Sequence, residues 1–215
     1  MKAPPTCPRC GHAVQAPGLM NSRWTCEDHG VVDPFQAAPK PGPDALAWLL
    51  KLTRVPVWLP WPLPPGWFVS GMTYAGDERR GGRASAVACS GPAPFGGVGE
   101  LLLVAEEPGV GLGAWFAGLD GTDPGPEVVT HRPGARLEAA GWPTQLWSIP
   151  RDPDSPVDRA AWVGEAGGLW LWLVTWPETA DLLLLDRLSL IDLREDGHAL
   201  DLPYGAPSPR LTGPG

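Results

Sequence analysis

Alternating and continuous runs of apolar residues along most of the chain predict β-strands. The clearest run is residues 169–175, where tryptophan and valine alternate with leucine, so that both faces of the strand are apolar. A strand of this kind belongs in the middle of a sheet that is covered on both sides. Residues 68–74 and 84–89 flank a charged, glycine-bounded turn and predict a hairpin. Further strands are expected at residues 99–106, 114–119, 136–140, 145–149, 158–164 and 188–193.

Helical patterns are short. Apolar residues at helical spacing predict one helix near residues 44–53, with Asp44 as its N-cap. The helix must end before Val55, because the residue ahead of a proline avoids the α region. Residues 179–186 predict one or two further helical turns. Together the patterns indicate an α+β fold whose main part is a mostly antiparallel β domain of about six to nine strands.

A segment rich in proline and tryptophan, residues 56–67, interrupts these patterns. Its five prolines exclude a helix or a central strand and favour an extended, polyproline-like conformation. The segment either packs along its own domain or offers Trp58, Trp61 and Trp67 as a contact surface for a partner.

The N-terminal region contains two matched pairs of potential metal ligands: Cys7, Cys10, Cys26 and His29. Two residues separate the members of each pair, and a glycine, Gly11 or Gly30, follows directly. A tight ligand turn points backbone N–H groups at the metal-bound atom, and glycine accepts the positive φ that this turn needs. The spacing predicts a structural zinc ion in a closed sphere, with no open position for catalysis. His12 could compete for the fourth position, but the similarity of the two pairs favours His29.

The order of these features predicts the domain organisation. Residues 1–38 form a zinc-ribbon-like module, and residues 39–43 form a proline-stiffened linker. The β domain then spans residues 44–204, and residues 205–215 are expected to be a flexible tail.

Charge and composition narrow the classes of function. The net charge of -8 disfavours binding to nucleic acid, which needs a basic surface. No apolar stretch near Met1 resembles a signal peptide, and no apolar run is long enough to span a membrane. Cysteines in ligand spacing, with Cys89 unpaired, fit a reducing compartment, so we expect a cytoplasmic protein.

One loop, residues 91–99, has the glycine content of an anion-binding loop. Its candidate ligand-binding residues are Ser90, Gly91, Gly96, Gly97 and Gly99. The loop lacks the lysine of a phosphate-binding P-loop, so a plain connection is the simpler interpretation. Cys89 and His131 are the accompanying candidates for chemistry, and a buried thiol is the simpler interpretation of Cys89. Two pairs of adjacent carboxylates, at residues 77–78 and 106–107, are expected to be solvated loop charges.

Several motifs point to a known family. They are Cys7-Pro8-Arg9-Cys10-Gly11, Val55-Pro56-Val57-Trp58, Pro60-Trp61-Pro62-Leu63-Pro64, Ala88-Cys89-Ser90-Gly91-Pro92, Gly99-Glu100-Leu101, Val104-Ala105-Glu106-Glu107, Gly109-Val110-Gly111-Leu112-Gly113, Gly164-Glu165-Ala166, Gly168-Leu169-Trp170-Leu171-Trp172 and Asp192-Leu193-Arg194. Through them the chain resembles an uncharacterised family of actinobacterial proteins with an N-terminal zinc-ribbon-like element. The resemblance covers nearly the whole chain and implies no catalytic residue.

The hypothesis from the sequence is a zinc-binding, non-enzymatic interaction or regulatory protein whose partner is another protein. A first alternative is an enzyme that transfers acyl or phosphoryl groups with the loop at residues 91–99. A second alternative, nucleic-acid binding through the zinc module, is disfavoured by the charge.

Overall fold

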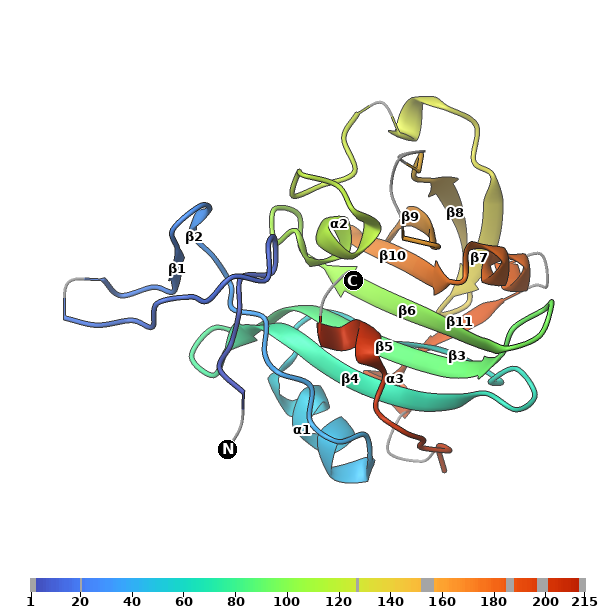
Figure 1. Cartoon of the computed structure of the whole chain (residues 1–215), viewed down its shortest axis with the longest axis horizontal. Coiled ribbons are helices and arrows are strands. Elements are labelled where there is room, and N and C mark those ends of the chain that lie inside the picture. Colours follow the sequence, from blue (N-terminus) through green and yellow to red (C-terminus); the bar gives the residue numbers. More distant parts are fainter. Residues whose placement is uncertain are drawn as a thin grey trace.

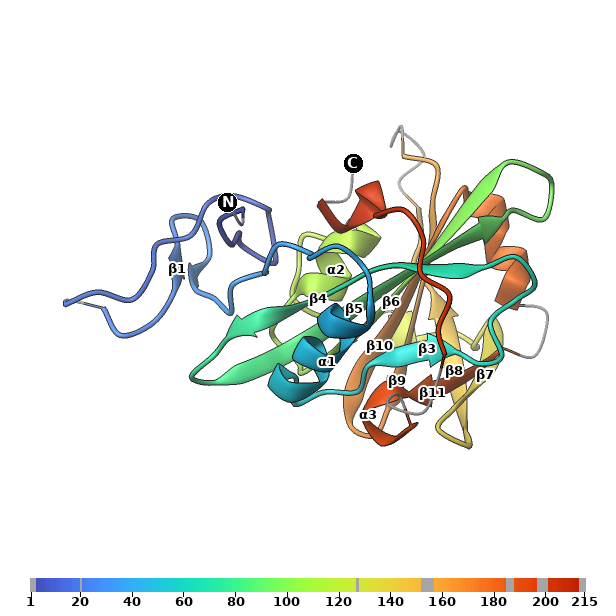
Figure 2. The same cartoon turned by 90° about the horizontal axis from the view of Figure 1, so that it is seen from below.

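The computed structural model describes residues 3–19, 21–126, 128–151, 157–184, 188–196 and 201–212. Nine strands in this part form one curled sheet (Figures 1 and 2). The strands are β3 (Trp58–Pro60), β4 (Phe68–Asp77), β5 (Gly81–Pro92), β6 (Val98–Glu106), β7 (Ala135–Ala139), β8 (Trp142–Ser148), β9 (Ala160–Ala166), β10 (Leu169–Trp176) and β11 (Ser189–Asp192). Their order across the sheet is β3-β11-β7-β8-β9-β10-β6-β5-β4, and only β7 and β11 run parallel. The predicted fold class is therefore confirmed.

The predicted hairpin and the predicted central strand are both present. β4 and β5 pair along their length, from Phe68 opposite Ser90 to Asp77 opposite Gly81. β6 pairs with β5 and continues the antiparallel sheet. β10 lies between β6 and β9. Leu171 and Leu173 enter one buried cluster while Trp172 and Val174 enter another, so the two parities of this strand supply the cores on the two faces of the sheet.

Helix α1 (Pro43–Leu52) covers the first core with Leu46 and Leu49. The predicted helix exists, but Asp44 is not its N-cap. Gly42 holds that position and no side chain caps the helix, because Pro43 with its fixed φ is the first helical residue. Asp44 instead lies in the first turn, where a carboxylate favours the helix dipole.

Helix α2 (Leu112–Ala117) covers the second core, and the strand predicted for residues 114–119 is wrong. Leu112 and Phe116 are four residues apart, which places both side chains on the buried face of one short helix. A run of apolar residues this short does not distinguish helix from strand, so tertiary packing decided the outcome.

The remaining elements are short. They are β1 (Thr25–Cys26), β2 (Gly30–Val31), η1 (Val128–Thr130), η2 (Glu178–Leu184), α3 (Leu193–Asp196) and η4 (Pro209–Thr212). η2 confirms the helical turns predicted after residue 178 as far as residue 184. The hairpin β1–β2 and the loop before it project from one end of the body (Figures 1 and 2). Within the described ranges, none of the helices combines the length and the apolar character needed to cross a lipid bilayer.

The C-terminal segment, which the sequence predicted to be a flexible tail from residue 205, packs on the body of the protein as far as residue 212. Tyr204 bridges to Val69 on the outer edge of β4, and the backbone N–H of Ser208 donates to the carbonyl of Ser70 at 2.8 Å. Leu211 is 3% exposed in the second core. An edge strand leaves backbone donors and acceptors unpaired, and this segment satisfies part of that edge. The last three residues lie outside the described part.

Candidate metal centre

Two similar turns position the four candidate ligands. In the first turn, the N–H of Gly11 donates to the carbonyl of Cys7 at 2.9 Å. In the second, the two-stranded pairing of β1 and β2 sets Cys26 opposite Gly30. Gly11 and Gly30 have φ values of 72° and 64°. Both turns therefore end in the left-handed conformation that the sequence predicted for glycine at these positions.

The four ligand atoms lie close together and can hold a metal ion. All of them are within 4.8 Å of one another. The Sγ atoms of Cys10 and Cys26 are 3.8 Å apart, and Nδ1 of His29 is 3.7 Å from the Sγ atoms of both Cys7 and Cys26. A tetrahedral ion with metal–sulfur bonds of about 2.3 Å separates two of its sulfur ligands by about 3.8 Å. The observed spacing therefore fits a four-coordinate ion.

The two buried cysteines have opposite shifts of pKa. Burial raises the pKa of Cys7 to about 12. Burial also raises the pKa of Cys26, but hydrogen bonds from His29 and from the backbone N–H groups of Asp28 and His29 outweigh it and lower the pKa to about 7. These N–H groups point at sulfur as the ligand turn requires. A cation supplies the charge that a buried set of thiolates needs.

His29 rather than His12 completes this set. Nδ1 of His12 lies 2.9 Å from Oδ2 of Asp28, and both side chains are exposed. His12, Asp28 and Cys10 also lie close together as a group of three. His12 therefore contacts the side chain of Asp28 in the second turn, while His29 lies with the three cysteines.

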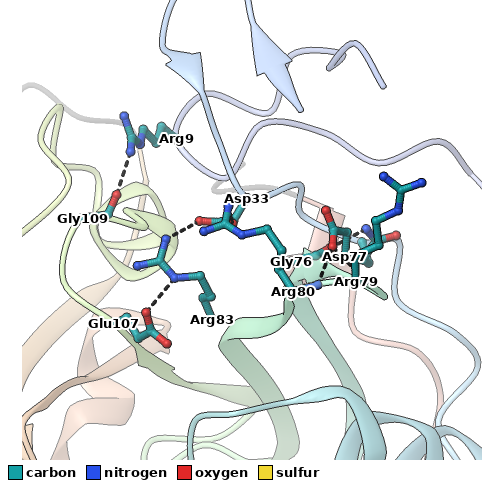
Figure 3. A network of polar contacts seen from close by, with 10 residues as sticks. Arg9, Asp33, Gly76, Asp77, Arg79, Arg80, Arg83, Glu107 and Gly109 are labelled. Atoms are coloured by element: carbon teal, nitrogen blue, oxygen red, sulfur yellow. Dashed lines mark hydrogen bonds and ion pairs between the residues drawn. The ribbon is translucent and has the colours of Figure 1, made fainter. Parts of the chain in front are cut away.

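The turns that carry the candidate ligands are anchored to the body of the protein. Arg9, between the first two cysteines, donates to the carbonyl of Gly109 at 2.6 Å (Figure 3). It also donates to the carbonyl of Val110 at 3.1 Å. Gly11 lies against the indole of Trp115, so closely that a Cβ atom at position 11 would be 2.9 Å from Cζ2 of that ring. The first turn thus packs on the loop before α2 and on α2 itself.

A second anchor follows β2. The carboxylate of Asp33 pairs with Arg80 at 3.3 Å and with Arg83 at 2.7 Å, and Arg83 also binds Glu107 at 2.6 Å (Figure 3). Burial alone would lower the pKa of Arg83, but Glu107 and Asp33 raise it above its ordinary value. This network joins the N-terminal module to the ends of β5 and β6.

The chain after Asp33 continues as an extension of the sheet. The N–H of Gln36 donates to the carbonyl of Tyr74 at 3.0 Å, and the N–H of Gly76 donates to the carbonyl of Pro34 at 2.9 Å. Phe35 is buried in the second core and lies edge-on to Trp115, with ring centroids 6.0 Å apart. The N-terminal module and the sheet therefore share both backbone pairing and a core.

The comparison with protein families agrees with this continuity. A family of unknown function, DUF6758, matches residues 1–211 as one unit. The chain belongs to the DUF6758 family. The match includes both the candidate metal centre and the whole sheet. No curated protein and no solved structure matched the sequence.

The predicted anion loop of this DUF6758 chain is a hairpin turn between β5 and β6. Gly96 and Gly97 are exposed at the turn, where the N–H of Gly96 donates to the carbonyl of Ala93 at 3.0 Å. Gly91 and Gly99 lie within the strands. Ser90 is buried and donates to Ser70 at 2.7 Å. The five predicted residues are therefore divided between a turn and a buried strand pair, rather than gathered around one anion.

Packing explains the predicted partner surface as well. Trp58 and Trp67 are each 5% exposed in the first core, and Trp61 packs against it partly buried. The indole of Trp67 lies on Gly91, where any side chain would overlap the ring. β3, within the same segment, is the edge strand beside β11. Of the two interpretations from the sequence, packing along its own domain fits these positions.

Cys89 and His131 differ in environment. Cys89 is fully buried, and burial raises the pKa of its thiol to about 12. His131 is exposed between η1 and β7, and its carbonyl accepts the indole N–H of Trp147 at 2.8 Å. A neutral, buried thiol is a weak nucleophile.

The pairs of adjacent carboxylates were predicted to be solvated, and this is wrong for Glu106. Its side chain is 0% exposed and accepts the backbone N–H groups of Leu112 at 2.7 Å and Gly113 at 3.2 Å. Burial raises its pKa to about 8, although the two N–H groups lower it in part. The sequence contained no signal for this contact, because the donors Leu112 and Gly113 open α2, a helix that the sequence did not predict.

Proposed function

We propose that this chain binds one structural zinc ion through Cys7, Cys10, Cys26 and His29 and works as a non-enzymatic interaction module. The observation that carries the proposal is the set of 3.7–3.8 Å separations among the four ligand atoms. Three thiolates and one imidazole are a frequent zinc ligand set, and four protein ligands close the coordination sphere.

The surroundings of the metal site support a role in contact rather than in catalysis. The module projects from the body (Figures 1 and 2), while Arg9 and Asp33 hold it in one orientation. Its projecting loop carries Leu19, which is fully exposed. A rigid, projecting element is suited to present a surface to a partner protein.

The alternatives have less support. The enzyme hypothesis relied on Cys89, His131 and the loop at residues 91–99, and Cys89 is buried while the loop forms a hairpin turn. Binding to nucleic acid would have to overcome the net charge of -8. We also propose that the protein acts in the cytoplasm, where thiol ligands stay reduced.

Metal analysis of the purified full chain tests the zinc site. We expect about one zinc ion per chain in the wild type and in His12→Ala, and loss of zinc in His29→Ala and Cys26→Ser. The two histidine variants are matched, because both remove one imidazole next to a ligand turn. Retention of zinc in His29→Ala together with loss in His12→Ala would contradict the ligand assignment.

The interaction role has its own test. Affinity capture from the native cell, with cross-linking, should recover a specific partner with the wild type that is lost with Cys26→Ser. Recovery of the same proteins with the wild type and with Cys26→Ser would show that the partner does not bind the surface that the metal orders.

A further inference from the structure

A groove of about 380 Å³ lies where the N-terminal module meets the body. It is lined by Pro17, Trp24, Gln36, Trp48, Tyr74, Asp77, Glu78 and Arg79. These residues come from the module, from α1, from β4 and from the turn between β4 and β5. The groove therefore exists only while the module is docked on the sheet.

Three aromatic side chains form its apolar surface. The rings of Trp48 and Tyr74 have centroids 5.2 Å apart and planes inclined by 66°, so Tyr74 packs against Trp48 edge to face. Trp24 comes from the module. Both tryptophans are half-buried, whereas Tyr74 is only 2% exposed and lies deeper. Faces of aromatic rings carry negative electrostatic potential and attract cations.

Two carboxylates stand at the turn beside these rings. Asp77 accepts the backbone N–H groups of Arg79 at 3.0 Å and Arg80 at 2.8 Å, which fixes the turn (Figure 3). Glu78 is exposed and has no ion-pair partner within the described residues. Burial raises the pKa of Tyr74 to about 12, and the charges of Glu78 and Asp77 raise it in the same direction. The negative field of the turn therefore reaches the phenol.

We infer that this groove binds an alkylated ammonium group, such as a methylated lysine side chain or a choline group. Aromatic walls offer contact to the alkyl groups, and the carboxylates complement the charge. An unalkylated ammonium ion is strongly hydrated and lacks this apolar surface. The inference rests on the proposed interaction role, because Trp24 belongs to the metal-ordered module.

Arg79 is the one cation among the lining residues and makes the charge argument testable. It opposes a bound cation, whereas its neighbour Glu78 attracts one. Removing the two charges one at a time should therefore change affinity in opposite directions. A groove that binds through apolar contact alone would respond to neither change.

The experiment titrates the zinc-loaded full chain with tetramethylammonium chloride and follows the indole N–H signals by NMR. Saturable shifts are expected with tetramethylammonium, and none with equal concentrations of sodium chloride or ammonium chloride. Glu78→Gln should weaken binding about fivefold, and Arg79→Gln should strengthen it by a similar factor. Glu165→Gln, which removes an exposed carboxylate on β9, is the control and should leave affinity unchanged.

Trp48→Ala should abolish binding, and zinc content and thermal unfolding show whether this variant still folds. If it does not fold, the two exposed charge variants still decide the question. Absence of saturable shifts with tetramethylammonium, or equal effects of Glu78→Gln and Glu165→Gln, overturns the inference. Such a result with one zinc ion still bound would leave the proposed function intact.

Two further ligands separate the possible sources of the alkylammonium group. Tighter binding of a short trimethyllysine peptide than of tetramethylammonium would identify a modified protein as the ligand. Tighter binding of phosphocholine would identify a free metabolite or a lipid headgroup. Both results support the groove chemistry, and binding of neither ligand overturns it.

Discussion

Glu106 is a buried carboxylic acid whose pKa lies well above its ordinary value. Its pKa of about 8 exceeds the ordinary value of 4.5, because the side chain is completely buried. The folded state therefore binds a proton in a pH range where the unfolded chain has released it. The stability that this proton contributes is fully present below pH 4.5 and is lost as the pH rises toward 8.

Glu106→Gln tests this linkage. The free energy of unfolding of the wild type, minus that of the variant, should fall by up to about 1.4 kcal/mol per pH unit between pH 5.5 and 7.5. Urea unfolding at several pH values measures it, with both proteins loaded with metal, so that titration of the metal ligands cancels. Parallel pH profiles of the two proteins would mean that Glu106 keeps an ordinary pKa.

Single residues also show which features can be predicted from the neighbouring sequence. The ligand turns could be predicted because Cys7, Cys10 and Gly11 are near neighbours, and the turn conformation depends mainly on them. The protonation of Glu106 could not be predicted from the sequence. Its side chain accepts the N–H groups of Leu112 and Gly113, and the positions of these donors depend on the packing of α2.

At the scale of elements, the C-terminal segment behaves as a strap along β4. It bonds to the backbone of Val69 and Ser70, buries Leu211 and places Arg210 3.0 Å from Glu100. The guanidinium of Arg210 also lies 5.1 Å from the ring centre of Trp176. This segment carries few apolar residues, so its sequence alone resembled a flexible tail.

Leu211→Ala should therefore destabilise the protein by about 2–4 kcal/mol, as expected when a buried leucine is truncated. Chemical unfolding measures the loss. Leu19→Ala is the matched control, because Leu19 is fully exposed, and its free energy of unfolding should stay within about 0.5 kcal/mol of the wild type. If both variants matched the wild type, the strap would contribute nothing to stability.

At the scale of the whole molecule, the N-terminal module with the candidate metal centre is continuous with the body of the protein. Arg9, Asp33 and Phe35 connect it to α2, to β5 and β6, and to the second core. If the module unfolds when the metal is removed, the β domain loses the contacts that the ordered module makes with it.

We therefore expect chelation, or Cys26→Ser, to lower the Tm of the sheet while the native near-UV signal persists at 25 °C. Loss of the two hydrogen bonds from Arg9, at about 1 kcal/mol each, corresponds to about 4–8 °C in a chain of this size. Thermal unfolding followed by near-UV circular dichroism measures the shift. Arg9→Gln, with metal still bound, should lower the Tm similarly. A module that unfolds without any change in the Tm of the sheet would contradict the coupling.

By itself, the sequence determined the features that depend on neighbouring residues. These are the two ligand turns, the hairpin of β4 and β5, the doubly apolar strand β10 and the short helix α1. Each has a local pattern of ligands, turn residues or apolar spacing, so short stretches were enough to predict it.

The contacts between segments far apart in the sequence could be recognised only in the tertiary structure. In the folded protein residues 112–117 form a helix and Glu106 is buried. Trp58 and Trp67 lie in the core, and the C-terminal segment runs along β4. The tertiary structure also places the N-terminal module against the sheet, where the two together form the aromatic groove. The physical reason is that burial and backbone pairing join residues far apart in the chain, and no local pattern records which distant partner will cover a given surface.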